Sequence, residues 1–258
     1  MSVSSQITVC IPTSPIPRHP DTGMIEQTIR SIRFHLPESR IIVMCDGVRP
    51  NVEFRRGQYE AYLEQLVALY AEDMDTDVVI FQEYSQQAKM MRHMLETVDT
   101  PYVLFCEHDG ELVTDTNPRN GYAETRPEDC QIAWQDILDL LASGGANMVR
   151  FYAWDEIHPA HAHLMCGHMV QGASHFIQTT QYSQWPHIAR TDFYKKMLAE
   201  HFAPDAIKMI EIGMYGPVGM AAWDQYRIVI YYPDGNARRF YHRNGRADEN
   251  GKQDPVDW

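Results

Sequence analysis

The chain has 258 residues, 44% of them hydrophobic, and its 22 Lys and Arg against 35 Asp and Glu give a formal net charge of −13. The hydrophobic content excludes general disorder, and the acidic balance argues against a protein that coats nucleic acid by neutralising phosphates. The apolar runs are too short to span a bilayer, and the first residues lack the features of a secretory signal. These properties predict a cytoplasmic protein with one α/β domain over residues 1–258.

Apolar runs alternate with helical patterns through the first 110 residues. The runs predict strands at 7–11, 40–45, 77–81 and 102–106, and the periodic segments predict helices at 24–34, 57–71 and 86–98. This alternation predicts a mostly parallel central sheet with helices on both faces. In such sheets, ligands bind outside the carboxyl ends of the strands.

The second half of the chain is less regular. Its patterns predict helices at 129–142 and 191–202 and strands at 147–152 and 227–232. Residues 153–185 are rich in His, Gln and aromatic side chains and show little periodicity. We therefore expect this half to be a looser part of the same domain.

Two carboxylates follow the strand predicted at 102–106. Glu107 and Asp109 are separated only by His108, and both can face one loop cavity. Mg²⁺ and Mn²⁺ prefer oxygen ligands and keep positions open for substrate phosphates. The pattern predicts a Mn²⁺ or Mg²⁺ site that meets a diphosphate; the alternative is an ordinary turn, because Asp-Gly is a common turn dipeptide.

Four short motifs, in order along the chain, resemble those of GT-A glycosyltransferases and most closely the family 2 group. The matching motifs are Ile11-Pro12-Thr13, Asp46, the basic helix segment 87–92 and Glu107-His108-Asp109, which resembles the Asp-x-Asp metal motif. Two features depart from the family pattern: Glu at the first acidic position, and Ser85-Gln86-Gln87 where the family has a glycine-rich turn before the third helix. The resemblance implies a Rossmann-like GT-A fold and a nucleotide-sugar donor, with a UDP-sugar as the first choice.

The resemblance also implies roles for the first half of the chain. Residues 1–112 would bind the nucleotide-sugar, with Pro12, Thr13 and Asp46 on the nucleoside and His108 beside it. For Asp46, a turn or helix-cap role is the alternative.

Lys89 and Arg92 are the basic residues of the third predicted helix. They lie three residues apart on one helical face, where they could contact a diphosphate. An ordinary solvated basic face is the alternative.

Residues 113–258 would then supply the acceptor site and the catalytic base. Transfer of a sugar to a hydroxyl needs a carboxylate that takes the hydroxyl proton, and the family resemblance implies inversion. Glu211 is an isolated acid in the apolar, glycine-rich segment KMIEIGMYGPV, where burial would raise its pKa. Glu211 is the first candidate and Asp192 the second, although Asp192 also fits a helix start.

The most basic stretch of the chain follows the last predicted strand. In the family resemblance, a His near the C-terminus is a further metal ligand, and His242 matches it. Arg243 and Arg246, with Arg238 and Arg239 before them, could clamp a diphosphate or contact an anionic acceptor. The alternative is a solubilising tail.

A histidine-rich segment offers a rival interpretation. His158, His161, His163, Cys166 and His168 could bind Zn²⁺ in a hydrolase, but their spacing matches no familiar zinc signature, so an acceptor-binding loop is favoured. A non-catalytic nucleotide-binding module is a third alternative.

The acceptor itself is left with two candidates. A saccharide is one, and a hydroxymethylated pyrimidine in DNA is the other, because the basic stretch and the aromatic residues Trp154, Tyr182 and Trp185 permit it.

Overall fold

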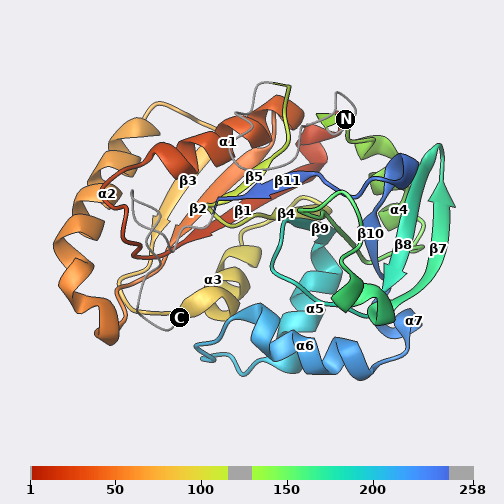
Figure 1. Cartoon of the computed structure of the whole chain (residues 1–258). Helices are drawn as coiled ribbons and strands as arrows, with labels where there is room; N and C mark the ends of the chain where they lie inside the picture. Colours follow the sequence, from red (N-terminus) through yellow and green to blue (C-terminus); the bar gives the residue numbers. More distant parts are fainter. Residues whose placement is uncertain (1, 116–129, 244–258) are drawn as a thin grey trace.

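The apolar runs of the first half form parallel strands of a nine-stranded sheet in the computed structural model, which describes residues 2–115 and 130–243 (Figure 1). The sheet order is β3-β2-β1-β4-β9-β6-β10-β8-β7. The first four strands in the chain are parallel to one another, which confirms the predicted alternation. They are β1 (Ile7–Thr13), β2 (Arg40–Cys45), β3 (Thr76–Ile80) and β4 (Tyr102–Phe105).

The second half adds five strands to the same sheet, and three of them were not predicted. β9 (His187–Arg190) runs antiparallel between β4 and β6 (Met148–Arg150). β10 (Ile228–Tyr231) is parallel to β6, and the hairpin of β7 (Met165–Gln171) and β8 (Ser174–Thr179) ends the sheet. The sheet is therefore mixed, with its four-stranded parallel part in the first half of the chain and one further parallel pair, β6 and β10, in the second.

Helices cover both faces of the sheet because successive strand residues are buried on opposite sides. Ile11, Val43 and Leu104 face one layer, whereas Ile42 and Phe105 face the other. Over the first face lie α1 (Gly23–His35), α2 (Arg56–Leu69) and α4 (Trp134–Ala142). Over the second lie α3 (Gln86–Leu95), α5 (Thr191–His201) and α6 (Ile210–Met220), followed by α7 (Trp223–Tyr226) (Figure 1).

Two helix properties bear on the sequence predictions. α4 begins at Trp134, later than the predicted start at residue 129, which itself lies outside the described residues. None of the helices in the described ranges is long and apolar enough to cross a bilayer.

A small second sheet brings the end of the described chain back to the end of β4. β5 (Gly110–Leu112) pairs antiparallel with β11 (Phe240–His242), so that His242 lies opposite Gly110. The alternative interpretation of this stretch as a solubilising tail is wrong for Arg238 and Arg239, since they are only 4% and 2% exposed. Arg238 pairs with Asp155 at 3.0 Å, and the guanidinium of Arg239 lies 5.1 Å from the centre of the Tyr231 ring.

Gly47, directly after β2, allows two backbone segments to approach closely. A Cβ atom there would lie 2.3 Å from the carbonyl carbon of Glu83 and 2.4 Å from the backbone nitrogen of Tyr84. We expect Gly47→Ala to lower the free energy of unfolding by about 1–3 kcal/mol, because backbone atoms cannot move aside as a side chain can. Urea denaturation measures this change.

Gly57 is the matched control for that substitution. It lies in α2, and an added Cβ would meet no atom within 4 Å. Gly57→Ala should raise the free energy of unfolding by up to about 1 kcal/mol, since alanine favours the helix. Equal effects of the two substitutions would contradict the close approach at Gly47.

Candidate active site

A pocket of about 370 Å³ lies at the carboxyl ends of the parallel strands, where ligands bind in open α/β sheets. The loops after β1, β2 and β4 form one side of it, through residues 14–16, Asp46 and residues 107–109. The opposite side comes from the second half of the chain. Its contributors there are Gln184, Trp185, Met209, Glu211 and His242.

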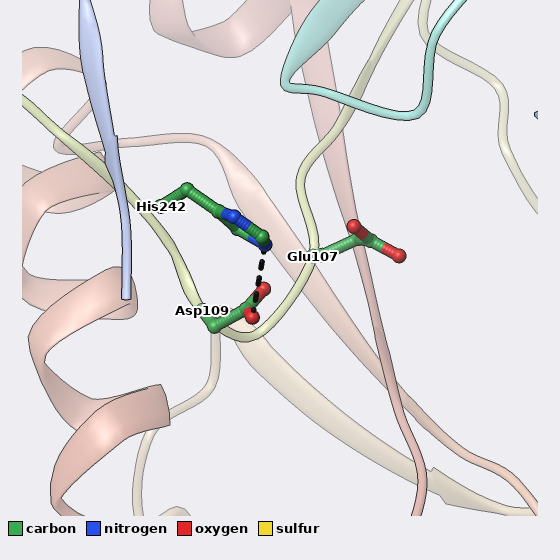
Figure 2. A group of neighbouring side chains, drawn as sticks. All are labelled: Glu107, Asp109 and His242. Carbon is green, nitrogen blue, oxygen red and sulfur yellow. Dashed lines mark ion pairs between the residues drawn. The ribbon is translucent and has the colours of Figure 1, made fainter. Parts of the chain in front are cut away.

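Three potential metal ligands meet in this pocket. One ligand atom from each of Glu107, Asp109 and His242 lies within 4.8 Å of the others. Figure 2 shows Glu107 and Asp109 on the loop after β4, with His242 reaching Asp109 from β11; the His242 Nε2 to Asp109 Oδ2 distance is 3.3 Å. The β5–β11 pairing produces this contact, because it places His242 beside the residue that follows Asp109.

The charges of this group fit a divalent cation. Burial raises the pKa of Glu107, and the nearby Asp109 carboxylate raises it further. The side-chain amide of Gln87 donates a 2.8 Å hydrogen bond to Glu107, which opposes part of that shift. A cation between the two carboxylates would remove their repulsion, and two carboxylates with one imidazole suit Mn²⁺ and Mg²⁺.

Glu211 lies in the first turn of α6 and lines the same pocket. Its side chain is half-buried, less enclosed than the apolar segment around it had suggested. Its charge contributes to the raised pKa of Glu107, so the two carboxylates are electrostatic neighbours. Burial lowers the pKa of the fully buried Arg150 to about 10, and the charge of Glu211 opposes that shift. Glu211 therefore interacts electrostatically with both Glu107 and the buried Arg150.

Asp192 is not brought to the pocket. It stands in the first turn of α5, where its carboxylate is exposed and pairs with the guanidinium of Arg190 at 2.5 Å. This hydrogen bond to Arg190 holds the pKa of Asp192 below its ordinary value. Its position fits the alternative of a residue that begins a helix.

Asp46 lines the pocket, but its carboxylate first organises the loop before α3. Oδ1 accepts hydrogen bonds from the backbone N–H groups of Gly47 and Ser85 at 2.8 and 2.7 Å, and Oδ2 accepts one from Gln86 at 3.0 Å. Burial raises the pKa of Asp46 to about 6, although these N–H donors and the charge of Lys89 act in the opposite direction. The helix-cap alternative thus describes part of its role.

This raised pKa predicts a pH dependence of stability. Between about pH 4 and pH 6 the folded state binds a proton at Asp46 that the unfolded chain has released, so stability falls as pH rises through that window. A two-unit shift corresponds to at most about 3 kcal/mol. Urea unfolding across this range should show a smaller slope for Asp46→Asn than for the native chain. Identical slopes would contradict a raised pKa at Asp46.

The turn before α3 has the shape expected of a glycine without containing one. Gln86 adopts a φ of 60°, in the left-handed region that favours glycine. This is the position where the sequence departs from the glycine-rich pattern of the resembled family. Gln86 also lines the pocket, and strained residues concentrate at binding sites.

The end of β1 is placed beside the pocket, although Pro12 and Thr13 are not among its lining residues. Thr13 is buried, and its hydroxyl lies 3.3 Å from that of Tyr62. The next residues, 14–16, do line the pocket, and the backbone N–H of Ile16 donates to Nδ1 of His19 at 3.3 Å. The predicted residues Pro12 and Thr13 therefore lie just before the segment that lines the pocket, and their contact with a nucleoside stays a prediction.

The predicted basic residues are distributed differently from expectation. Lys89 is near Asp46 but does not line the pocket, and Arg92 donates to the carbonyl of Leu198 at 2.6 Å, which ties α3 to α5. The guanidinium of Arg243 forms an ion pair with the buried Glu111, so it does not act as an open clamp. Arg246 lies outside the described residues.

The histidine-rich segment does not form the zinc site of the rival interpretation. Nδ1 of His161 lies 2.8 Å from the hydroxyl of Tyr152, and Nδ1 of His158 accepts from the backbone of Ala160. Within residues 2–115 and 130–243, the group at Glu107, Asp109 and His242 is the one place where three potential ligands converge. His108, by contrast, does line the pocket, and its role in donor binding stays a prediction.

Gln87, Gln184 and Trp185 line the pocket, although no sequence motif predicted the two glutamines there and Trp185 was only one of several aromatic candidates. β9 runs antiparallel to β4, so the residues before β9 lie at the carboxyl end of β4. A prediction of that strand direction would have placed Gln184 and Trp185 in the site. Gln87 belongs to the basic helix segment 87–92, in which only the charged residues Lys89 and Arg92 were predicted to bind a ligand.

Comparison with known proteins gives the fold. No family model matches the chain, and no curated protein matches its sequence. S. aureus TarS (residues 1–349) superposes with a TM-score of 0.52 at 14% identity, covering 92% of this chain and 60% of that one. The same protein in complex with UDP-GlcNAc gives a TM-score of 0.51 at 14% identity, covering 98% and 61%.

A second structure agrees with the first. The mannosyltransferase PcManGT from Pyrobaculum calidifontis, in complex with GDP-Man and Mn²⁺, superposes with a TM-score of 0.51 at 14% identity, covering 89% of this chain and 55% of that one. This chain thus spans less than two thirds of the length of these structures. It shares a GT-A-like α/β fold with these glycosyltransferases, as the sequence motifs implied.

Proposed function

We propose that this chain is a metal-dependent glycosyltransferase of the family 2 type, which transfers a sugar from a nucleotide-sugar to an acceptor hydroxyl with inversion. The observation that carries the proposal is the convergence of Glu107, Asp109 and His242 in one pocket with Glu211. This pocket lies at the carboxyl ends of parallel strands, in a fold shared with enzymes solved with UDP-GlcNAc and GDP-Man. A UDP-sugar is the first donor to test.

Glu211 is the proposed general base. Its carboxylate takes the proton of the acceptor hydroxyl while the hydroxyl oxygen forms a bond to the anomeric carbon of the donor sugar. The bond between that carbon and the diphosphate oxygen breaks, and the diphosphate leaves with the electron pair. Attack from the face opposite the leaving group inverts the configuration.

Glu107, Asp109 and His242 would hold Mn²⁺ or Mg²⁺. When bound, the cation would neutralise charge on the leaving diphosphate. Gln87 orients Glu107 by its hydrogen bond, and the β5–β11 pairing orients His242. Asp46 fixes the loop that would face the nucleoside, and one side of that carboxylate, Oδ2, accepts a single backbone hydrogen bond.

A thermal-shift panel tests the binding half of this proposal. Nucleoside diphosphates and nucleotide-sugars are each measured with Mn²⁺ and with a chelator. We expect one nucleotide class to raise the melting temperature in the presence of Mn²⁺, since a ligand at about 100 times its Kd stabilises by about 2.7 kcal/mol. A panel without any metal-dependent, nucleotide-specific shift would contradict the proposal.

A further inference from the structure

An aromatic wall leads from the pocket to the surface of the molecule. Trp185 lines the pocket together with Glu211, and its ring centre lies 4.9 Å from that of Trp154. Both rings also meet Tyr152, at 4.9 Å from Trp185 and 5.4 Å from Trp154. Trp154 is 39% exposed, so the wall formed by Tyr152, Trp154 and Trp185 begins in the pocket that Glu211 also lines and ends in solvent.

The wall is held in place from behind. The Tyr152 hydroxyl accepts a hydrogen bond from the backbone of His158 at 3.2 Å and lies 2.8 Å from Nδ1 of His161. Trp185 packs edge-on against Phe240 at 5.4 Å. Rigid aromatic faces of this kind bind flat apolar surfaces, such as the C–H face of a sugar ring or a base.

A buried amide lies at the inner end of the wall. Gln184 lines the pocket and is 3% exposed, yet its Nε2 donor has no hydrogen-bond partner among the described residues. Buried polar groups in folded proteins are nearly always hydrogen-bonded, so this donor is suited to a ligand that accepts a hydrogen bond. A sugar hydroxyl can accept from Gln184 and can present its proton to a carboxylate.

The charge of the wall selects between ligand classes. Residues 151–189, which carry the whole wall, contain no Lys and no Arg, and they contribute Asp155 and Glu156. The nearby Arg238 is buried and paired with Asp155. A DNA or phosphate-polymer acceptor needs cationic side chains that neutralise its phosphates, and the wall offers none of its own.

We propose that this wall, with Gln184, is an acceptor subsite that binds a neutral saccharide ring. The inference rests on the proposed glycosyl transfer for its role as an acceptor site, but the binding itself does not require transfer. The saccharide stacks on Trp154 and Trp185, accepts a hydrogen bond from Gln184 and directs one hydroxyl toward Glu211. The same surface disfavours nucleic acid as the acceptor, because the wall has no cationic side chains for its phosphates.

Binding to an immobilised panel tests the subsite. Neutral mono- to tetrasaccharides are compared with single- and double-stranded DNA that contains hydroxymethylated pyrimidines. We expect the full chain to retain at least one neutral saccharide, with little dependence on salt, and to leave the DNA unbound. Retention of the DNA in place of every saccharide, or of no probe at all, would overturn the proposal.

Two variants locate the binding. Trp154→Ala should weaken saccharide binding about tenfold or more, because it removes the exposed stacking face. Phe34→Ala is the matched control, since Phe34 is a half-exposed aromatic residue on α1 and no part of the pocket. Equal affinity of the native chain and Trp154→Ala would also overturn the proposal.

The outcome separates this inference from the proposed function. The thermal-shift panel reports nucleotide and Mn²⁺ binding, which does not require Trp154, because Trp154 is not among the residues that line the pocket. If the protein binds nucleotide with Mn²⁺ but no saccharide, the proposed donor site is supported and the acceptor subsite is contradicted. If the protein binds saccharide through Trp154 but no nucleotide, the saccharide subsite is supported and the proposed function is contradicted.

Discussion

Asp109→Asn is expected to reduce metal-dependent sugar transfer by about 100-fold or more. Even residues that only orient metal ligands commonly contribute 10- to 100-fold in metal affinity or activity, so loss of a ligand should cost at least as much. Asp109 is one of two carboxylates in the group with Glu107 and His242, and its replacement leaves one carboxylate. Initial rates with Mn²⁺, and the Mn²⁺-dependent thermal shift, measure the effect.

The Asp109→Asn variant should stay folded, because the substitution removes a negative charge that repels the Glu107 carboxylate and raises its pKa. Urea denaturation checks this point. Asp192→Asn makes the same chemical change at an exposed carboxylate away from the pocket, so its rate should stay close to that of the native chain. A native rate for Asp109→Asn would remove Asp109 from the metal site.

Glu211→Gln should lower kcat by about 10²- to 10⁴-fold, which is the usual contribution of a general base. Glutamine keeps the size of the side chain but cannot take the acceptor proton. Nucleotide and Mn²⁺ binding should persist, since Glu211 is not one of the three proposed metal ligands. Steady-state kinetics with varied donor concentration separate kcat from KM.

Asp192→Asn again supplies the comparison, because Asp192 was the second candidate for the base. We expect its kcat to match that of the native chain. If Asp192→Asn lost kcat while Glu211→Gln kept it, the assignment of the base would be reversed, and the position of Glu211 beside Glu107 would need another explanation.

The parallel half of the fold could be predicted because its signals are local. Arg40–Cys45 is an apolar run closed by Asp-Gly, and the strand found there has the predicted bounds. The alternation with helices predicted parallel strands, so Glu107 and Asp109 were expected at the carboxyl end of a parallel strand, and they follow β4 there.

The other half of the site depends on pairings between residues far apart in sequence. β9 inserts antiparallel next to β4, and no local pattern in its four residues indicates that direction. Gln184 and Trp185 enter the pocket only through this insertion. His242 was suggested by family resemblance, whereas the physical reason for its position is the β5–β11 pairing.

Charged residues were the hardest to place. Arg92 and Arg243 have the charge that a diphosphate requires, yet one binds backbone carbonyls of α5 and its flank and the other pairs with Glu111. A sequence shows that a cation is present but not which acceptor it meets. The same limit applies to Asp46, whose backbone partners at Ser85 and Gln86 come from a different loop.

The release of nucleoside diphosphate from a panel of nucleotide-sugars, with Mn²⁺ and with a chelator, tests the central claim most directly. We predict that one donor is cleaved slowly with Mn²⁺ alone, faster when a neutral saccharide is added, and not at all with the chelator. A nucleotide-binding module without catalysis would bind the donor and release nothing. Absence of metal-dependent release from every donor, with and without saccharide, would contradict a glycosyltransferase.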